Sequence, residues 1–329
     1  MKKMRDRLAL HTWTLDTAPL PEALRAAKSA GWNAVELRRI DFTRCFERGM
    51  SNAQVLDLVR KSGLEVACIG TEYGLIFAQG EERSRVLKAL EETCANAKAL
   101  GCGLVMIAPG QNPPGTLRDA AANFRAGGDI AKAHGVRFAL EFNSAHGVIR
   151  NLQAGAEIVE LASHPSCGLL LDAYHMERSG SGGRGFESYP AEKIFAFQYS
   201  DVPDAPPSTQ NRPTDRLPPG KGKVRWKEVF QLLGEKGYAG HLSYEAPNPE
   251  QWARPPEEVA REFSLRGGTA LLKTTLSLCP ACLAHVPAAV YVESGRVLMA
   301  KPCGTHGITR AVIENDERYY RLSTKDRWG

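Results

Sequence analysis

The stretch that decides the fold is FAFQYSDVPDAPPSTQNRPTDRLPPGKG at residues 195–222, where an apolar run ends in a polar, proline-rich loop. Three other segments share the design of an apolar run that ends in an acid: VRFALE at 136–141, CGLLLD at 167–172 and HLSYE at 241–245. If these segments are neighbouring parallel strands, their carboxyl ends bring four side chains to one rim, those of Glu141, Asp172, Gln198 and Glu245. Hard oxygen ligands that converge in this way hold a divalent metal ion.

The remaining chain alternates between short apolar runs and longer amphipathic stretches. We expect strands at residues 8–15, 33–37, 64–69, 104–108, 136–141, 167–171, 194–200 and 241–245. We expect helices at residues 21–31, 52–61, 81–100, 117–134, 152–162, 227–236 and 257–275, and at most a short helix at 187–193. Every expected strand is apolar enough to be buried, as parallel strands covered by helices are.

Eight strand and helix units in roughly 270 residues are typical of a (β/α)8 TIM barrel, an α/β fold whose functional residues follow the carboxyl ends of the strands. A doubly wound open sheet is the alternative, but no G-x-G-x-x-G sequence follows the first strand to support a dinucleotide site. The composition changes after residue 275. We therefore expect a barrel over residues 1–276 and a small second domain over residues 277–329.

An acid at the end of a single strand often caps the next helix or pairs with an arginine. Here three acids end the fifth, sixth and eighth expected strands, and the amide of Gln198 ends the seventh strand between them. This repetition favours a shared metal ion over three unrelated caps.

Five short motifs, in this order and spacing, resemble the xylose-isomerase-like barrels, also called the sugar phosphate isomerase/epimerase superfamily. They are LEFN at 140–143, LLLDAYH at 169–175, FAFQYSDV at 195–202, DRLPPGKG at 215–222 and LSYEAP at 242–247. The resemblance extends from residue 8 to about residue 275. It implies that one divalent ion, Mn²⁺, Mg²⁺, Co²⁺ or Zn²⁺, is bound by Glu141, Asp172, Gln198 and Glu245.

Gln198 departs from the pattern of many family members, which have histidine at this position. A glutamine there resembles a branch that includes 3-dehydroshikimate dehydratases and inosose-dehydratase-like proteins. The change also makes the ligand set entirely oxygen, which suits Mg²⁺ or Mn²⁺ better than Zn²⁺.

The ligand set suggests a mechanism. A metal ion held by carboxylates polarises a substrate carbonyl or hydroxyl, and Glu141 and Glu245 are the natural pair to remove and return a proton on the adjacent carbon. Transfer on one carbon gives epimerisation, and transfer between adjacent carbons gives aldose–ketose isomerisation. Departure of a β-hydroxyl gives dehydration, with His175 as the assisting acid. The alternative role for His175 is a hydrogen bond to Asp172.

Other residues near the rim are candidates for substrate contacts. Arg216 matches a family position that contacts substrate oxygens, although an arginine in a proline-rich loop can also be a surface residue. His11 and Trp13 follow the first strand and either form an apolar wall for a sugar face or belong to the core. Glu72 follows the third strand and either lines the pocket or pairs with a neighbouring arginine. Glu36, at the end of the second strand, either lines the pocket or pairs with Arg38 or Arg39, and of these we favour the structural role.

The tail carries a second metal signature. Cys279-Pro-Ala-Cys282 and Cys303-Gly-Thr-His306 are separated by a predicted hairpin with strands at 289–292 and 296–300. Two such knuckles describe a structural zinc ribbon, in which Zn²⁺ supplies the folding energy that so short a segment cannot obtain from a core. The alternative is three free thiols and an unrelated histidine.

With NDERYY at 315–320, this tail resembles the rubredoxin-like module that opens a subset of radical-SAM enzymes. The C-x3-C-x2-C motif of those enzymes is absent from the sequence, so we expect no radical chemistry. The module either docks a protein or peptide partner or reflects a fusion whose catalytic half lies elsewhere.

Bulk composition limits the other classes. A net charge of +5 in 329 residues argues little for nucleic acid, and the basic start is not followed by an apolar stretch that would form a signal peptide or membrane span. We therefore expect a cytoplasmic protein, in which the scattered cysteines are reduced thiols: Cys45, Cys68, Cys94, Cys102 and Cys167. The family also includes an AP-site endonuclease with three zinc ions and many strand-end histidines, which the second to fourth strands here do not supply.

The sequence thus predicts a metal-dependent isomerase or epimerase of a small polyhydroxylated carbonyl compound, with no nucleic-acid or membrane partner and a possible homo-oligomer. The nearest alternative is a dehydratase on the same metal site. An alternative from another class is a non-catalytic partner protein that docks through the zinc ribbon.

Overall fold

A computed structural model describes the chain at residues 4–110, 115–205, 213–262, 270–293, 296–316 and 319–320. The chain divides into two compact units, Met1–Ser264 and Leu265–Gly329. Among the described residues, no helix combines the length and the apolar character that crossing a bilayer would require.

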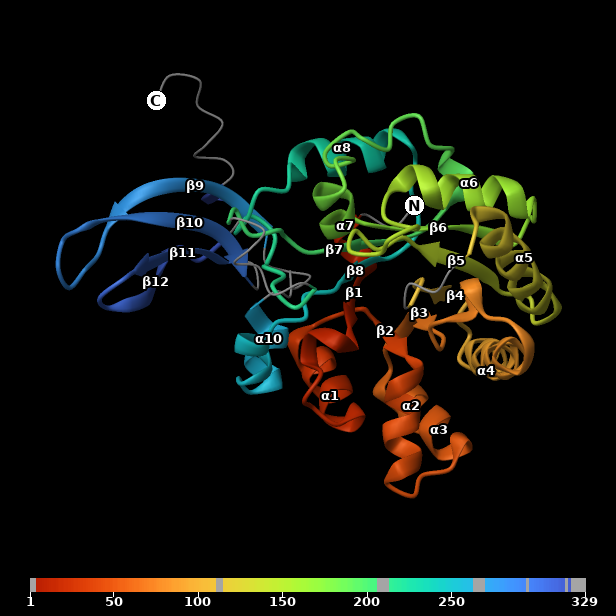
Figure 1. Cartoon of the computed structure of the whole chain (residues 1–329). Coiled ribbons are helices and arrows are strands. Elements are labelled where there is room, and N and C mark those ends of the chain that lie inside the picture. The colour runs from red at the N-terminus through yellow and green to blue at the C-terminus, as the bar shows by residue number, and fades with distance from the viewer. Residues whose placement is uncertain are drawn as a thin grey trace. The chain divides into compact units, whose positions relative to one another are not determined.

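The first unit is a closed barrel of parallel strands in sequential order, surrounded by helices (Figure 1). The barrel closes where β8 pairs with β1, with Leu8 beside Leu242 and Leu10 beside Tyr244. The expected TIM barrel is confirmed. Its strands are β1 (Leu8–His11), β2 (Ala34–Arg38), β3 (Glu65–Gly70), β4 (Leu104–Ile107), β5 (Arg137–Glu141), β6 (Cys167–Asp172), β7 (Ile194–Tyr199) and β8 (Leu242–Tyr244).

Local signals set the ends of several helices. Pro21 lies in the first turn of the first helix, and Gly31 follows that helix with a φ of 85°, a left-handed conformation that favours glycine. Ser51 and Gln54 form a reciprocal capping box at the start of another helix. The helices described in this unit are α1 (Leu20–Ala30), α2 (Arg39–Glu47), α3 (Asn52–Ser62), α4 (Gly80–Ala99), α5 (Leu117–Ala133), α6 (Leu152–Ala162), α7 (Ala173–Arg178), α8 (Trp226–Glu235), α9 (Pro249–Trp252) and α10 (Pro256–Glu262).

Two expectations are corrected. The strand expected at 8–15 ends at His11, and Thr12–Leu15 is a 3-10 helix. The helix expected at 257–275 is wrong beyond Glu262, because Ala270–Leu278 forms strand β9 instead. Its β-branched and apolar residues find a hydrogen-bonding partner in the next strand of the tail, which local periodicity does not reveal. The predicted domain boundary between residues 276 and 277 falls inside this strand.

The second unit is an antiparallel sheet in the order β12-β11-β10-β9 (Figure 1). Its strands are β9 (Ala270–Leu278), β10 (His285–Glu293), β11 (Arg296–Cys303) and β12 (Gly307–Glu314). The expected hairpin corresponds to β10 and β11, which pair from Ala289 with Ala300 to Glu293 with Arg296. Residues 294 and 295 at its tip lie outside the described residues. The sequence did not predict the outer strands β9 and β12.

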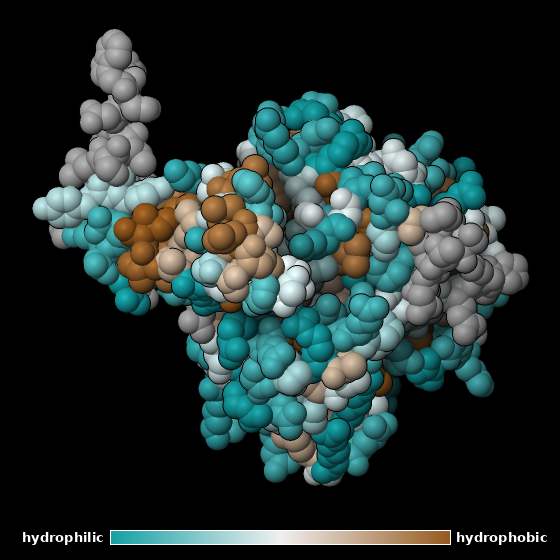
Figure 2. Space-filling view, turned by 90° about the vertical axis from the view of Figure 1, so that its left-hand side faces the viewer, coloured by the Kyte–Doolittle hydropathy of each residue, from teal (hydrophilic) through white to brown (hydrophobic). Residues whose placement is uncertain are grey.

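This sheet leaves large apolar side chains exposed. Leu276 is 73% exposed and Ile308 is 68% exposed. The register places Leu276 beside Pro287 and Ile308 beside Pro302. In Figure 2, which turns the β9–β12 side of Figure 1 toward the viewer, apolar residues gather on this surface. Exposed apolar patches of this kind are common at docking surfaces.

Candidate active site and metal centre

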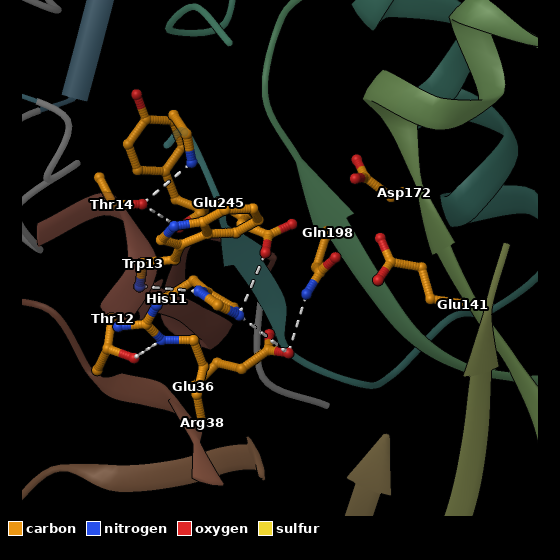
Figure 3. A network of polar contacts seen from close by, with 12 residues as sticks. His11, Thr12, Trp13, Thr14, Glu36, Arg38, Glu141, Asp172, Gln198 and Glu245 are labelled. Atoms are coloured by element: carbon orange, nitrogen blue, oxygen red, sulfur yellow. Dashed lines mark hydrogen bonds and ion pairs between the residues drawn. The ribbon is translucent and has the colours of Figure 1, made fainter. Parts of the chain in front are cut away.

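The carboxyl ends of four strands bring the predicted ligands to one end of the barrel (Figure 3). Glu141, Asp172 and Gln198 end or nearly end β5, β6 and β7, and Glu245 directly follows β8. Asp172 and Gln198 are paired across neighbouring strands. None of the four residues is more than 6% exposed. The strand ends therefore hold three carboxyl groups and one amide where little water reaches.

Some of these side chains already lie close enough together to share a metal ion, whereas Gln198 is hydrogen-bonded to another residue. Glu141, Asp172 and His175 each offer a ligand atom, and these atoms lie within 4.8 Å of one another. Gln198 donates a hydrogen bond of 2.9 Å from Nε2 to Oε1 of Glu36. His175 therefore joins the predicted set as a further possible ligand, from the short helix α7 that follows Asp172.

Two buried oxygens of the rim, Glu141 Oε1 and Gln198 Oε1, have no hydrogen-bond partner among the described residues, whereas Glu245 Oε2 forms an ion pair of 3.0 Å with Arg216 Nη1. Buried acceptors are rarely left unpaired, because losing water without a replacement costs roughly 1–3 kcal/mol each. A divalent cation would give these hard oxygen donors the partner they lack. The residues present therefore fit the ion that the fold implies.

Arg216 reaches into the same cluster from the loop after β7. Its Nη1 lies 2.5 Å from Asp172 Oδ2 and 3.0 Å from Glu245 Oε2. Its guanidinium also stacks on the ring of Tyr174, with 4.3 Å between the carbon Cζ and the ring centroid. Burial opposes the charge of Arg216, but the carboxylates of Asp172 and Glu245 outweigh it and raise the pKa of this guanidinium. Arg216 thus remains a cation and bridges two predicted ligands.

The loop that carries Arg216 is held by two buried or nearly buried aspartates. Asp215 accepts hydrogen bonds from the hydroxyl of Tyr174 at 2.5 Å and from Arg178 at 2.6 Å. Asp201 is fully buried and fixes the PPGKG turn with four hydrogen bonds. The donors are Val202 N, Gly220 N, Val224 N and Trp226 Nε1. The hydrogen bonds of the DRLPPGKG motif therefore fix the position of Arg216.

Two neutral histidines flank the glutamates. His11 Nδ1 accepts the backbone N–H of Trp13, so the ring proton lies on Nε2, 3.3 Å from Glu245 Oε1. His175 Nδ1 accepts the N–H of Ser144, and its Nε2 lies 3.3 Å from Arg216 Nη2, a donor, and 3.6 Å from Glu141 Oε1. Burial lowers the pKa of both histidines well below its usual value.

Burial also shifts the acids. It raises the pKa of Glu141 well above its usual range and raises that of Glu245, and the crowding of carboxylates adds to the shift of Glu141. The pKa of Asp172 rises to about 6 and that of Glu36 to about 8, again chiefly through burial. Crowded acids with raised pKa values form a cluster that a cation stabilises in its charged form.

A cavity of about 630 Å³ opens above this cluster. Glu141, His175, Arg216 and Glu245 line it together with aromatic and polar side chains that include Trp13, Tyr73, Asn143 and Glu82. Its volume lies in the range of small-molecule sites. Of these lining residues, Tyr73, Glu82 and Asn143 were not predicted, although Tyr73 directly follows Glu72 at the same rim.

Of the other predicted substrate-binding residues, only some line this cavity. Trp13 lines it, whereas His11 is 4% exposed and contacts Glu245 from below. Glu72 pairs with Arg39 at 3.5 Å and with Arg85 at 2.6 Å and faces an adjoining cavity. Of the two roles foreseen for Glu72, its contacts match the pairing with an arginine.

The tail brings its four predicted ligands together. Cys279 Sγ and Cys303 Sγ lie 3.8 and 3.6 Å from His306 Nδ1, and Cys282 Sγ lies 3.8 Å from Cys303 Sγ. A tetrahedron with zinc–sulfur bonds of about 2.3 Å has edges of about 3.7 Å, so these spacings suit Zn²⁺. Backbone N–H groups lower the pKa of the Cys279 and Cys303 thiols, which favours the thiolate that zinc binds.

Comparison with known families matches both units. Residues 24–264 match a family model described as the xylose isomerase-like TIM barrel. The chain belongs to the xylose isomerase-like TIM barrel family. Residues 271–315 match a model described as the HMPTM N-terminal zinc ribbon domain. Both resemblances expected from the sequence are confirmed by these matches.

Individual relatives of this xylose isomerase-like barrel have low identity. An inosose isomerase of Halalkalibacterium halodurans is 24% identical over 257 residues, 75% of this chain and 90% of that protein. A 3-dehydroshikimate dehydratase of Pseudomonas aeruginosa is 26% identical over 235 residues, which cover 70% of this chain but only 36% of that protein. A crystal structure of the IOLI protein with a binding zinc atom has a TM-score of 0.69 and 21% identity over 78% of this chain and 94% of that chain. At this identity the structural likeness concerns the fold alone.

Proposed function

We propose that this chain is a divalent-metal-dependent isomerase or epimerase of a small sugar or polyol carbonyl compound. The relatives include isomerases and dehydratases, so the chain is an enzyme of this broad class. The observation that carries the finer proposal is that buried oxygens of Glu141 and Gln198 lack a hydrogen-bond partner among the described residues, next to Asp172 and Glu245 at the floor of a sugar-sized cavity.

The proposed ligands in the barrel are Glu141, Asp172, Gln198 and Glu245. Their oxygen donors favour Mn²⁺ or Mg²⁺, with Co²⁺ or Zn²⁺ as alternatives. When bound there, the cation stabilises negative charge that develops on a substrate oxygen.

The chain's own groups then handle the proton. Glu141 and Glu245 are the proposed pair that takes a proton from a substrate carbon and returns it. The Nε2–H of His11 faces Glu245 and holds this carboxylate in place, and Nε2 of His175 lies near both Glu141 and Arg216. Trp13 offers an aromatic face to the sugar carbons. We propose that Arg216 donates to substrate oxygens.

The second candidate is a dehydratase of the 3-dehydroshikimate or inosose type on the same residues. The oxygen-only ligand set with Gln198 and the match to a dehydratase favour it. His175 is then the proposed acid that protonates the leaving hydroxyl, since it lines the cavity beside Glu141.

The decisive experiment combines elemental analysis with isotope transfer. Wild type, Glu245→Gln and Cys282→Ser are analysed for bound metal, and two pools that are lost independently would support a barrel site and a separate ribbon site. A single pool, lost only with Cys282→Ser, would remove the enzymatic proposal. Ketoses, inososes and dehydroshikimate are then tested in D₂O, where deuterium incorporation without loss of water identifies an isomerase and loss of water identifies a dehydratase.

For the tail we propose a structural Zn²⁺ on Cys279, Cys282, Cys303 and His306. The exposed Leu276 and Ile308 support a role in docking a protein or peptide partner. The barrel cysteines are all buried free thiols, which supports a cytoplasmic location.

A further inference from the structure

A contact across the barrel interior joins Glu36 to Gln198. Gln198 Nε2 donates to Glu36 Oε1 at 2.9 Å, and the two residues are 0% and 1% exposed. They come from β7 and β2, which β8 and β1 separate in the barrel. The hydrogen bond therefore spans the barrel interior rather than two neighbouring strands.

We infer that Glu36 is a positioning residue that turns the oxygen of the Gln198 amide, and not its nitrogen, toward the candidate metal centre. The inference rests on the proposed metal function. It concerns a residue for which the sequence favoured a structural role over lining the pocket.

The chemistry of an amide makes such a device necessary. The oxygen and nitrogen of a glutamine side chain have nearly the same shape, yet only the oxygen can bind a cation. Oε1 of Glu36 accepts this hydrogen bond either as a carboxylate oxygen or as the carbonyl oxygen of the neutral acid, so Glu36 selects the orientation in which Nε2 faces it. In Figure 3 the nitrogen of Gln198 lies on the side of Glu36, and its oxygen lies on the side of Glu141 and Asp172. That oxygen is one of the buried atoms without a partner among the described residues.

Glu36 is itself held in place. The protonated Nε2 of His11 lies 3.8 Å from Glu36 Oε1 and 3.3 Å from Glu245 Oε1, so the ring faces both carboxyl groups. His11 thus contacts both Glu36, which orients Gln198, and Glu245, which is a second proposed metal ligand.

A cavity next to Glu36 argues against the interpretation that this residue only fills the core. A second cavity of about 290 Å³ lies at the amino ends of the strands, and Glu36 lines it together with Glu65, Arg137 and His241. A residue selected for packing would fill this space, whereas the carboxyl group of Glu36 is directed to Gln198. Its hydrogen bond of 2.9 Å at this rim is with a proposed ligand.

The test measures metal affinity and does not need the substrate. Mn²⁺ is titrated into chelator-treated full-length protein, loaded first with Zn²⁺ in the ribbon, and binding is followed by calorimetry and by the electron paramagnetic resonance spectrum of Mn²⁺. For Glu36→Met, which fills a similar volume but has no oxygen to accept from Gln198, we expect an affinity about 10- to 100-fold lower, as is typical when a group that orients a ligand is removed. Glu65 lines the same lower cavity, and Glu65→Met should bind Mn²⁺ like wild type.

A double-variant cycle separates positioning from a general effect. In a Gln198→Ala background the change Glu36→Met should have no further effect on Mn²⁺ affinity, because the amide that Glu36 orients is gone. If Glu36→Met does not fold, Glu36→Asp keeps the carboxyl group but withdraws it by one methylene, and it should show the same loss. Equal Mn²⁺ affinity in wild type and the folded variant, or an equal loss in both backgrounds, would overturn the inference. Wild type that binds no Mn²⁺ in the barrel would instead overturn the proposed function.

Discussion

Arg216 Nη1 lies 2.5 Å from Asp172 Oδ2, in a contact where the two side chains are 2% and 0% exposed. The same nitrogen lies 3.0 Å from Glu245 Oε2, so one guanidinium ties the end of β6 to the residue after β8. A buried charge that loses its partner is costly, whereas an exposed pair contributes little. The rim therefore carries an internal cation that partly neutralises its acids.

The first prediction concerns this internal cation. Arg216→Met leaves Asp172 and Glu245 buried without their partner, and we expect the metal-free protein to lose about 3–5 kcal/mol of unfolding free energy. Because a divalent ion can take over the neutralisation, Mn²⁺ should raise the melting temperature more in the variant than in wild type. Thermal unfolding with and without Mn²⁺ measures both effects.

Arg184→Met is the matched control for that change. Arg184 also pairs with two acids, Glu187 and Glu235, but on the exposed surface. We expect its unfolding curve to follow that of wild type. Equal destabilisation by the two variants would show that the Arg216 bridge is not the cause.

The second prediction concerns the thiols. Burial raises the pKa of Cys102 to about 11 and those of Cys94 and Cys167 to about 12, so at pH 8 fewer than about one in a thousand of these groups is a thiolate. A thiol reagent at pH 8 should therefore leave the barrel cysteines of the native protein unmodified. Removing zinc with a chelator should expose only the ribbon cysteines, and mass spectrometry should find the label on Cys279, Cys282 and Cys303. Fast labelling of the barrel before unfolding would contradict this prediction.

The third prediction uses the two nitrogens of His175. A glutamine amide takes the place of Nε2, which faces Glu141, whereas an asparagine amide takes the place of Nδ1, which faces Ser144. If the group that faces Glu141 matters for proton transfer, His175→Gln should retain more activity than His175→Asn. We expect losses in kcat of about 10²–10⁴-fold for asparagine and a smaller loss for glutamine. Steady-state kinetics with the substrate found in the isotope screen measures the order, and the reverse order would reject this role.

Much of the fold could be predicted because its signals are local. The helix expected at 152–162 has those bounds in the structure, and the strand ends that carry Glu141 and Asp172 were read from apolar runs that stop at an acid. Helix α2 could not be predicted, since its charged sequence RIDFTRCFE lacks a clear apolar stripe. Strand β9 was missed because its partner β10 defines it.

The candidate site could likewise be predicted only in part. The convergence of Glu141, Asp172, Gln198 and Glu245 followed from the barrel, since parallel strands end at one rim. The bridge from Arg216 and the contact between Glu36 and Gln198 depend on a loop fold and on the width of the barrel interior. No sequence spacing encodes either contact.

The last prediction tests the support of Arg216 through a glycine. A Cβ on Gly222 would clash with the backbone oxygen of Val202 and lie 2.6 Å from Asp201 Oδ1. Because Asp201 fixes the turn that follows Arg216, Gly222→Ala should distort the loop, lower the unfolding free energy by about 1–3 kcal/mol and reduce kcat/KM. Gly103→Ala is the control, since nothing lies within 4 Å of a Cβ there, and it should leave stability and activity unchanged. Thermal unfolding and kinetics of the two variants measure the difference, and a Gly222→Ala protein as stable and active as Gly103→Ala would mean that this turn does not position Arg216.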